Sequence, residues 1–215
     1  MQGTRRLARI GIYGGTFDPV HIGHLLLAEQ CREQCQLDEV WFVPAAHSPF
    51  KSPADQTDGE HRLAMLRAAI APYPQFRALR WELDRPGPSW TVDTLEFLHA
   101  ENPARELFLL VGADSLRSLH LWRSPARIAE LATLVGVNRG DRPLPPADLL
   151  QQSLGHPAAN LKLISMPGLD VSATDIRDRL RSGRSARVLT PDVVLDYARE
   201  HGLYRPAATL PAIDV

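Results

Sequence analysis

The stretch YGGTFDPVHIGHLLLAEQ, from Tyr13 to Gln30, joins a glycine-rich turn to an apolar run with helical spacing. Two histidines, His21 and His24, stand three residues apart where the turn should become a helix. Residues at i and i+3 share a helix face, so both imidazoles can face the same side of the first turn. The pattern leaves three interpretations open: a phosphate site, a metal site and simple packing.

A helix that begins near His21 or Ile22 would direct free backbone N–H groups and its positive dipole end toward the preceding strand. That arrangement favours anions, and above all phosphate. Gly23 lies between the histidines and leaves room close to the backbone. The stretch lacks the Gly-x-Gly-x-x-Gly spacing of dinucleotide-binding folds and the lysine of a P-loop. Phosphate is therefore the favoured interpretation, while a metal or a structural role stays open.

The chain has two cysteines, Cys31 and Cys35, whose i, i+4 spacing places them on one face of a predicted helix. Together with His21 and His24 they could in principle form a zinc set of two cysteines and two histidines. We interpret them instead as small buried residues, the usual state of a free cysteine. Nothing in the pattern indicates a disulfide scaffold.

Composition restricts the class of protein. A chain of 215 residues with 44% apolar residues predicts one globular domain over 1–215, with a core at about 9–204 and flexible tails. The net charge of −1 argues against a general nucleic-acid binder but not against a small anionic ligand. No apolar run approaches the roughly 20 residues of a membrane span, and the basic N-terminus does not match a signal peptide. We expect a cytoplasmic protein without a nucleic-acid or membrane partner.

Short apolar runs alternate with helical patterns along the chain. Strands are predicted at 9–15, 39–45, 76–84, 106–114, 133–139 and 161–167. Helices are predicted at 25–37, 59–71, 91–102, 174–182 and 191–202, with Thr91 as an N-cap. The proline-rich stretch at 138–160 is predicted to be a mobile connection.

Continuous apolar strands separated by helices predict an α/β fold, a Rossmann-like doubly wound parallel sheet with a helical C-terminal portion. Ligands of such sheets bind beyond the carboxyl ends of the strands. The candidate site residues therefore fall within 14–24, 44–51, 84–91, 112–115, 138–142 and 166–177.

Two stretches near opposite ends of the chain carry a family resemblance. GGTFDPVHIGH (14–24) resembles the His-x-Gly-His signature of the nucleotidyltransferase superfamily, which class I aminoacyl-tRNA synthetases share. VSATDIRDRL (171–180) resembles the Ile-Ser-Ser-Thr-x-Ile-Arg box of small-molecule adenylyltransferases. A synthetase would show a Lys-Met-Ser-Lys-Ser type loop and a much longer chain.

Four further stretches resemble the bacterial nicotinate-nucleotide adenylyltransferases of NAD synthesis: VPAAHSPFK (43–51), PSWTVDTLEFL (88–98), LLVGADSLRSLHLW (109–122) and VLDYAREHGLY (194–204). The resemblance spans about residues 9–204. Three positions depart from it: Phe50 stands where histidine is common, Trp90 replaces a usual tyrosine, and Ala173 replaces a serine. These departures concern the shape of the substrate pocket, since no charged group of the signature is lost.

The resemblance implies adenylyl transfer from ATP to nicotinate mononucleotide, with Mg²⁺ accompanying ATP and no metal ligands from the protein. The alternatives are an adenylyltransferase for nicotinamide mononucleotide or phosphopantetheine, and a non-catalytic nucleotide-binding module of the same fold. A pantetheine enzyme usually carries a threonine where this chain has His21. Self-association into a homo-oligomer stays open.

The resemblance also implies the site residues. The catalytic set that stabilises phosphate charge is His21, His24 and Arg177. The ATP-binding set is Gly14, Gly15, Thr16, Phe17, Gly23, Gly112, Ser172 and Thr174. The substrate-binding set is Lys51 for the acceptor phosphate, Thr91 for the nicotinate carboxylate, Asp114 for ribose hydroxyls, Trp122 for stacking on the pyridine ring, and Arg139. Asp18 is expected to fix the turn before Pro19.

Overall fold

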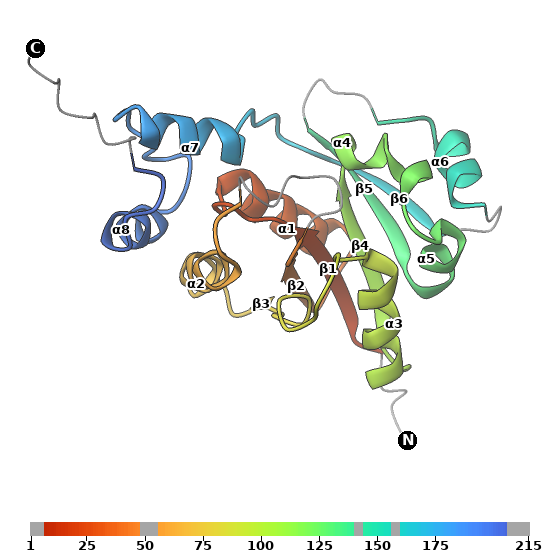
Figure 1. The fold of residues 1–215 in the computed structure, drawn as a ribbon. Helices are drawn as coiled ribbons and strands as arrows, with labels where there is room; N and C mark the ends of the chain where they lie inside the picture. The colour runs from red at the N-terminus through yellow and green to blue at the C-terminus, as the bar shows by residue number, and fades with distance from the viewer. Residues whose placement is uncertain (1–6, 48–55, 140–143, 156–159, 206–215) are drawn as a thin grey trace, which may run out of the picture.

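The computed structural model describes residues 7–47, 56–139, 144–155 and 160–205. At its centre lies a parallel six-stranded sheet in the order β3-β2-β1-β4-β5-β6 (Figure 1). The strands are β1 (Arg9–Gly15), β2 (Glu39–Pro44), β3 (Phe76–Ala78), β4 (Glu106–Gly112), β5 (Thr133–Arg139) and β6 (Leu161–Met166). Strand order reverses between β1 and β4, the place where an open α/β sheet binds ligands. The predicted fold class is confirmed.

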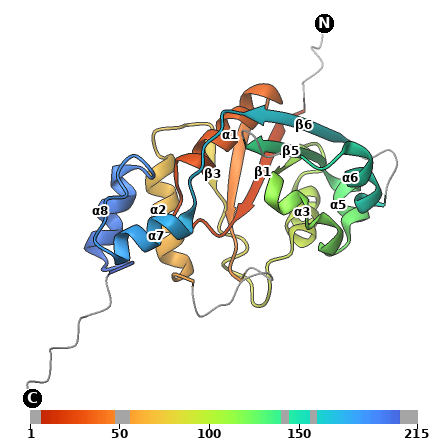
Figure 2. The same cartoon turned by 90° about the horizontal axis from the view of Figure 1, so that it is seen from above.

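Helices cover both faces of this sheet. One face carries α1 (Ile22–Gln34), α2 (Gly59–Ile70) and α8 (Asp192–Glu200). The other carries α3 (Thr91–Glu101), α5 (Pro125–Leu131) and α6 (Ala147–Leu154), so that the two groups lie on opposite sides of the molecule (Figure 2). The remaining elements are α4 (Ala113–Leu116), the 3₁₀ turn η2 (Leu119–Leu121) and α7 (Ala173–Arg181), which lies near α2 and α8.

Strand β4 shows why the sequence folds in this way. Leu107, Leu109 and Val111 enter the core under α3, α5 and α6. Phe108 and Leu110 enter the core under α1, α2 and α8. A strand whose two faces are both buried needs a continuous apolar run, and only a sheet covered on both sides satisfies it.

The strand expected at 76–84 is wrong beyond Ala78. From Arg80 the chain turns, and Leu83 N and Asp84 N both donate to Arg80 O, at 2.8 and 3.3 Å. The Arg80 guanidinium also donates to the Asp84 carboxylate at 2.9 Å. A turn with its own local hydrogen bonds can bury alternate side chains, so alternation alone did not distinguish it from a strand.

The stretch at 138–160, expected to be a mobile connection, contains α6. Leu150 and Leu154 of this helix are buried against the core under α3 and α5. Pro146 lies at the N-cap and Gly155 ends the helix in the left-handed region, with φ of 63°. These are ordinary helix boundary signals, and the surrounding prolines obscured them.

Cys31 and Cys35 are free thiols, and both are buried in the core between the sheet and α1, as the packing interpretation predicts. Burial raises the pKa of both thiols. Among the described residues, no group of three or more histidine, cysteine, aspartate or glutamate side chains could hold a metal ion. Within the same residues, no helix is long and apolar enough to cross a membrane.

Candidate active site

Two adjoining cavities open at the carboxyl edge of the sheet. The larger, of about 460 Å³, lies at the β1/β4 switch point and extends to the start of α3. The smaller, of about 230 Å³, lies between the turn after β1 and the start of α7. Thr16, Phe17 and His24 line both cavities. A ligand in one cavity therefore meets a ligand in the other at His24.

The turn after β1 has an unusual backbone. The Asp18–Pro19 peptide bond is cis, and Phe17 has φ of 49°, in the left-handed region. The Phe17 side chain is 1% exposed and packs edge-on against the His24 ring, with centroids 5.0 Å apart. Packing against a buried aromatic ring therefore fixes the His24 imidazole from one side.

Asp18 fixes this turn through both carboxylate oxygens, as expected from its place before Pro19. Tyr204 Oη donates to Oδ1 at 2.5 Å, and Thr57 N donates to Oδ2 at 3.1 Å. Asp18 is only 3% exposed, and its carboxylate raises the pKa of Tyr204 together with burial, which is the larger cause. Its side chain is thus engaged within the protein.

The glycines before the turn differ in their surroundings. A Cβ on Gly14 would meet nothing within 4 Å in the described part of the chain, and Gly14 lines the larger cavity. A Cβ on Gly15 would lie 2.8 Å from the Phe17 ring. Gly14 therefore leaves space in the cavity, whereas Gly15 allows Phe17 to pack.

The two histidines occupy the first turn of α1. His21 is the N-cap and is 3% exposed, and its ring stacks on that of His24 with centroids 3.6 Å apart and planes 20° apart. His21 N donates to His24 Nδ1 at 3.2 Å. A neutral His24 then carries its proton on Nε2, a donor suited to an anion. A Cβ on Gly23 would lie 3.1 Å from the His21 ring, so the glycine permits this stacking.

Helix α7 contributes the other wall of the smaller cavity. Ser172 is its N-cap and accepts from Asp175 N at 3.1 Å. Arg177 Nη1 donates to Asp18 O at 2.7 Å, and Nη2 lies 3.3 Å from Thr174 Oγ1. Arg177 Nε is buried and has no hydrogen-bond partner among the described residues. The contacts of Nη1 and Nη2 therefore hold the guanidinium in place, and Nε makes none of them.

The segment between α7 and α8 forms hydrogen bonds with the start of α1. Thr190 Oγ1 donates to Val20 O at 2.7 Å, and Ile22 N donates to Leu189 O at 3.0 Å. Ile176 of α7 is fully buried in a small cluster that Ile22 also contacts. Residues far apart in sequence thus position the two histidines relative to α7.

The larger cavity contains most of the residues expected to bind the acceptor. Thr91, Asp114 and Trp122 all line it, and so does Gly112 of the predicted ATP-binding set. Thr91 is the first residue of α3, whose N-cap is Trp90, so the prediction that Thr91 caps the helix is wrong. Asp114 lies in α4 and not on the preceding strand. Thr91 can still offer a backbone N–H at a helix N-terminus.

Two predicted substrate residues lie wholly or partly outside the described part of the structure. Lys51 lies outside the described residues, as does the neighbouring Phe50. Arg139 ends β5 at the carboxyl edge of the sheet, and its side chain is not described.

Sequence reasoning missed Arg62, a buried arginine of α2 that is 1% exposed. It donates to Thr57 O at 2.8 Å, Thr16 O at 2.7 Å and Ala45 O at 2.8 Å. These carbonyls belong to the loops that follow β1 and β2 and precede α2. Burial lowers the pKa of Arg62. No local pattern distinguishes this arginine from an exposed one, because its partners are backbone atoms.

Two other residues of the larger cavity, Glu82 and Arg123, were also missed, and Ser89 was covered only by the candidate range 84–91. Glu82 was assigned to a strand, and Arg123 follows Trp122 directly. Ser89 precedes the start of α3. The residues after Ala78 could have been suspected, since loops at the carboxyl edge bind ligands.

The chemistry of the smaller cavity suits an anion of several charges. It combines two imidazoles, one guanidinium and the N-terminus of a nine-residue helix. Helix N-termini and charged donors together bind phosphate groups. The larger cavity, with Trp122 and Trp90 in its lining, suits a flat ring.

Comparisons with known proteins agree with this geometry. A family model described as cytidylyltransferase-like matches residues 12–179. A probable nicotinate-nucleotide adenylyltransferase of Roseiflexus sp. (strain RS-1) is 45% identical over 198 residues, which cover 92% of this chain and 98% of that protein. One of the same description from Thermus thermophilus is 44% identical, covering 92% of this chain and all of that protein. The chain belongs to the nicotinate-nucleotide adenylyltransferase family. The resemblance seen in its motifs is confirmed.

Solved structures support the fold of this family. Plasmodium falciparum nicotinic acid mononucleotide adenylyltransferase complexed with NaAD has a TM-score of 0.74 and 20% identity, covering 92% of this chain and 97% of that one. A putative nicotinate-nucleotide adenylyltransferase from Vibrio parahaemolyticus has a TM-score of 0.64 and 19% identity, covering 93% and 97%. The fold is thus shared across large differences in sequence.

Proposed function

We propose that this protein transfers the adenylyl group of ATP to nicotinate mononucleotide, giving nicotinate adenine dinucleotide and pyrophosphate. The observation that carries the proposal is the pair of adjoining cavities with His24 in common. A transferase for two phosphate-bearing substrates needs two sites that meet at the reacting phosphates. The names of relatives at 44–45% identity support the choice of acceptor.

The reaction requires no protein nucleophile. The acceptor phosphate is largely a dianion at neutral pH, since its second pKa is about 6. One of its oxygens attacks the α-phosphorus of ATP. The bond from that phosphorus to the bridging oxygen breaks, and pyrophosphate leaves with this oxygen. The protein has to align the two phosphates and stabilise the negative charge of the transition state.

The smaller cavity would perform the charge stabilisation. His24 Nε2 and the His21 imidazole would donate to the phosphate oxygens of ATP at the junction of the cavities. Arg177, which lines this cavity, would hold the β- and γ-phosphates through its guanidinium. Ser172 and Thr174 would add donors from the N-terminus of α7.

Mg²⁺ would enter with ATP and neutralise charge on the triphosphate. Asp18 is a poor ligand for it, because Tyr204 and Thr57 already donate to its two carboxylate oxygens. The described residues contain no cluster that would replace it. The ion would therefore be held by phosphate oxygens and water.

The larger cavity would bind the acceptor. Trp122 would stack on the pyridine ring, and the start of α3 at Thr91 would receive the nicotinate carboxylate. Asp114 would accept from ribose hydroxyls, although Arg117 Nη1 already donates to its Oδ1 at 3.2 Å. Lys51 and Arg139 remain proposed contacts of the acceptor.

Pyrophosphate release with ATP and magnesium, measured against a panel of acceptors, tests the proposal. Nicotinate mononucleotide should exceed nicotinamide mononucleotide by at least about tenfold in kcat/KM, which corresponds to about 1.4 kcal/mol. The product should be identified as the dinucleotide by chromatography. Equal rates with the two acceptors, or no turnover with either, would exclude this assignment.

A further inference from the structure

Glu82 is a buried carboxyl group in the wall of the larger cavity, and the mechanism above does not use it. It is 8% exposed. Thr94 Oγ1 donates to Glu82 Oε1 at 2.5 Å. The Ser89 side chain also interacts with the carboxyl, because it opposes the rise that burial causes in the Glu82 pKa. Burying a carboxyl group is costly, so its retention at a cavity calls for a specific role.

The hydrogen bonds of Glu82 continue into a second loop. Ser89 Oγ accepts from Ala46 N at 2.9 Å, and Ser89 N donates to His47 O at 3.0 Å. Ala46 and His47 follow β2 at the carboxyl edge of the sheet. Since Ser89 Oγ accepts from Ala46, its own proton is available to donate to Glu82. The carboxyl thus connects the loop after β2 to helix α3.

These contacts enclose the start of α3. Ser89 precedes, and Thr94 follows, the pair Trp90 and Thr91, which begin the helix and line the cavity. A carboxyl bound on both sides of that pair determines where the first helical turn lies. The backbone N–H groups of this first turn then have a fixed direction toward the cavity.

We infer that Glu82 is a positioning residue for the acceptor: through Ser89 and Thr94 it holds the first turn of α3 in the place where it receives the nicotinate carboxylate. The inference rests on the proposed function. Glu82 does not touch the reacting phosphates in this scheme, which lie at the His24 junction. Its effect is therefore specific to the acceptor and absent for ATP.

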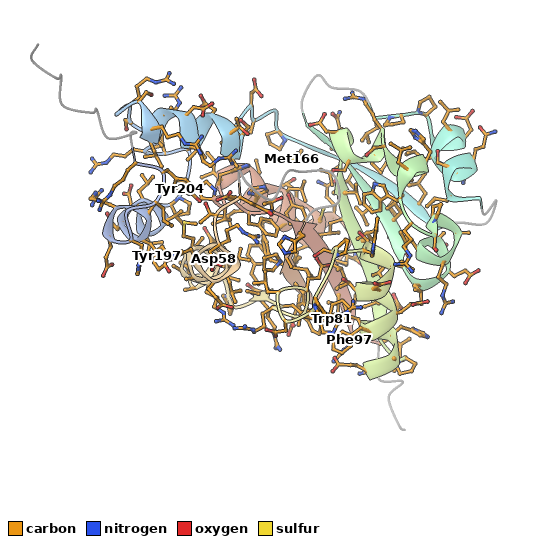
Figure 3. The ribbon with its side chains drawn as sticks, in the orientation of Figure 1. Asp58, Trp81, Phe97, Met166, Tyr197 and Tyr204 are labelled. Carbon is orange, nitrogen blue, oxygen red and sulfur yellow. The ribbon has the colours of Figure 1, made fainter. Side chains whose placement is uncertain are left out.

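Other contacts keep the same segment attached to α3 without Glu82. Trp81 stacks on Phe97, with centroids 4.7 Å and planes 17° apart, and the two side chains lie together in Figure 3. Arg85 lies over the Trp81 ring at 4.3 Å and pairs with Asp93 at 3.6 Å. A change at Glu82 alone should therefore leave the segment folded, and positioning can be measured separately from folding.

The test is a steady-state comparison of Glu82→Gln with the wild-type protein, varying each substrate in turn. The amide keeps the size of the side chain but cannot accept from both hydroxyls as the carboxylate does. We expect KM for nicotinate mononucleotide to rise about tenfold, the effect of about one hydrogen bond to a charged group. KM for ATP should stay within about twofold.

Glu39→Gln is the matched control. The Glu39 carboxylate accepts from Trp41 Nε1 at 2.6 Å and Arg77 Nη2 at 2.7 Å, and it begins β2 at the amino edge of the sheet. This variant should change neither KM. If Glu82→Gln does not fold, Thr94→Val and Thr94→Ser carry the test: the valine removes the donor and should show the acceptor defect, and the serine restores it.

The outcomes separate the two proposals. A wild-type protein that forms no dinucleotide overturns the proposed function, and the role of Glu82 with it. An active wild type whose folded Glu82→Gln variant has an unchanged acceptor KM overturns only the role of Glu82. A rise of both KM values by the same factor also overturns the role of Glu82, because the effect would then not be specific to the acceptor.

Discussion

Arg177 Nη1 donates a hydrogen bond of 2.7 Å to the backbone oxygen of Asp18, a residue 159 positions earlier in the chain. The contact joins helix α7 to the turn after β1 and closes the smaller cavity. Arg177 Nε is left as a buried donor with no partner among the described residues. The two signature stretches thus meet at one cavity, the proposed phosphate site.

Arg177→Lys should lower kcat/KM for ATP by about 100-fold, because an ammonium cannot hold Asp18 O and donate to phosphate in the same planar arrangement. Steady-state kinetics with ATP varied measures the loss. Arg181→Lys is the control on the same helix, since Arg181 pairs with the exposed Asp178 and should keep full activity. Equal activity of the two variants would contradict a phosphate role for Arg177.

Gly14→Ala should fold with the stability of the wild type and lose activity. The added Cβ would meet no atom of the other described residues within 4 Å, so we expect it to displace a ligand in the cavity. We expect kcat/KM to fall by about tenfold or more while the melting temperature is unchanged. A fully active Gly14→Ala protein would show that no ligand approaches this backbone.

Gly23→Ala should lower activity without lowering the stability of the protein. Its Cβ would press on the His21 ring at 3.1 Å, while alanine favours the helix by up to about 1 kcal/mol. We expect reduced turnover, by about tenfold, in a protein whose free energy of unfolding is unchanged or higher. Urea unfolding and turnover measured on the same sample test this. Full turnover with a displaced His21 ring would exclude the histidine from catalysis.

Arg62→Met should destabilise the protein by about 3 kcal/mol, because three partly buried carbonyl groups would lose a charged donor. Arg67→Met, at an exposed position of the same helix, should change the free energy of unfolding by less than about 0.5 kcal/mol. Denaturant titration of both variants measures the difference. Similar values for the two would mean that Arg62 does not hold the loops together.

Glu82 should also affect stability as a function of pH. Burial raises its pKa above the ordinary value of 4.5. The folded state therefore holds this proton more tightly than the unfolded state, and the stability gained from it is lost as pH rises through the raised pKa. Glu82→Gln lacks this titration. Its stability relative to the wild type should increase from about pH 4.5 upward, and a constant difference across that range would be the contrary result.

Much of the fold was predictable because burial leaves a direct record in sequence. β1 and β5 begin and end as the apolar runs at 9–15 and 133–139 predict. The end of β3 was not predictable, because Arg80 and Asp84 stabilise a turn through contacts that alternation does not reveal. Helix α6 was hidden because its two buried leucines are few for a pattern and prolines surround them.

Some residues of the candidate site could be predicted from the sequence and others could not. His21, His24 and Arg177 line one cavity, and they could be singled out because they stand in two recognisable signature stretches. Glu82 and Arg62 could not, since each acts through long-range hydrogen bonds that only the folded chain brings together. Sequence patterns thus indicate the proposed ligand contacts better than the buried groups that surround them.

The formation of nicotinate adenine dinucleotide by His24→Ala, next to the wild type and His99→Ala, tests most directly whether the two substrates meet at His24. His99 is exposed on α3 and should be dispensable. We expect His24→Ala to melt cooperatively and to lose about 100-fold or more in kcat, while His99→Ala keeps the wild-type rate. A cooperatively folded His24→Ala protein that forms the dinucleotide at the wild-type rate would contradict the proposed site.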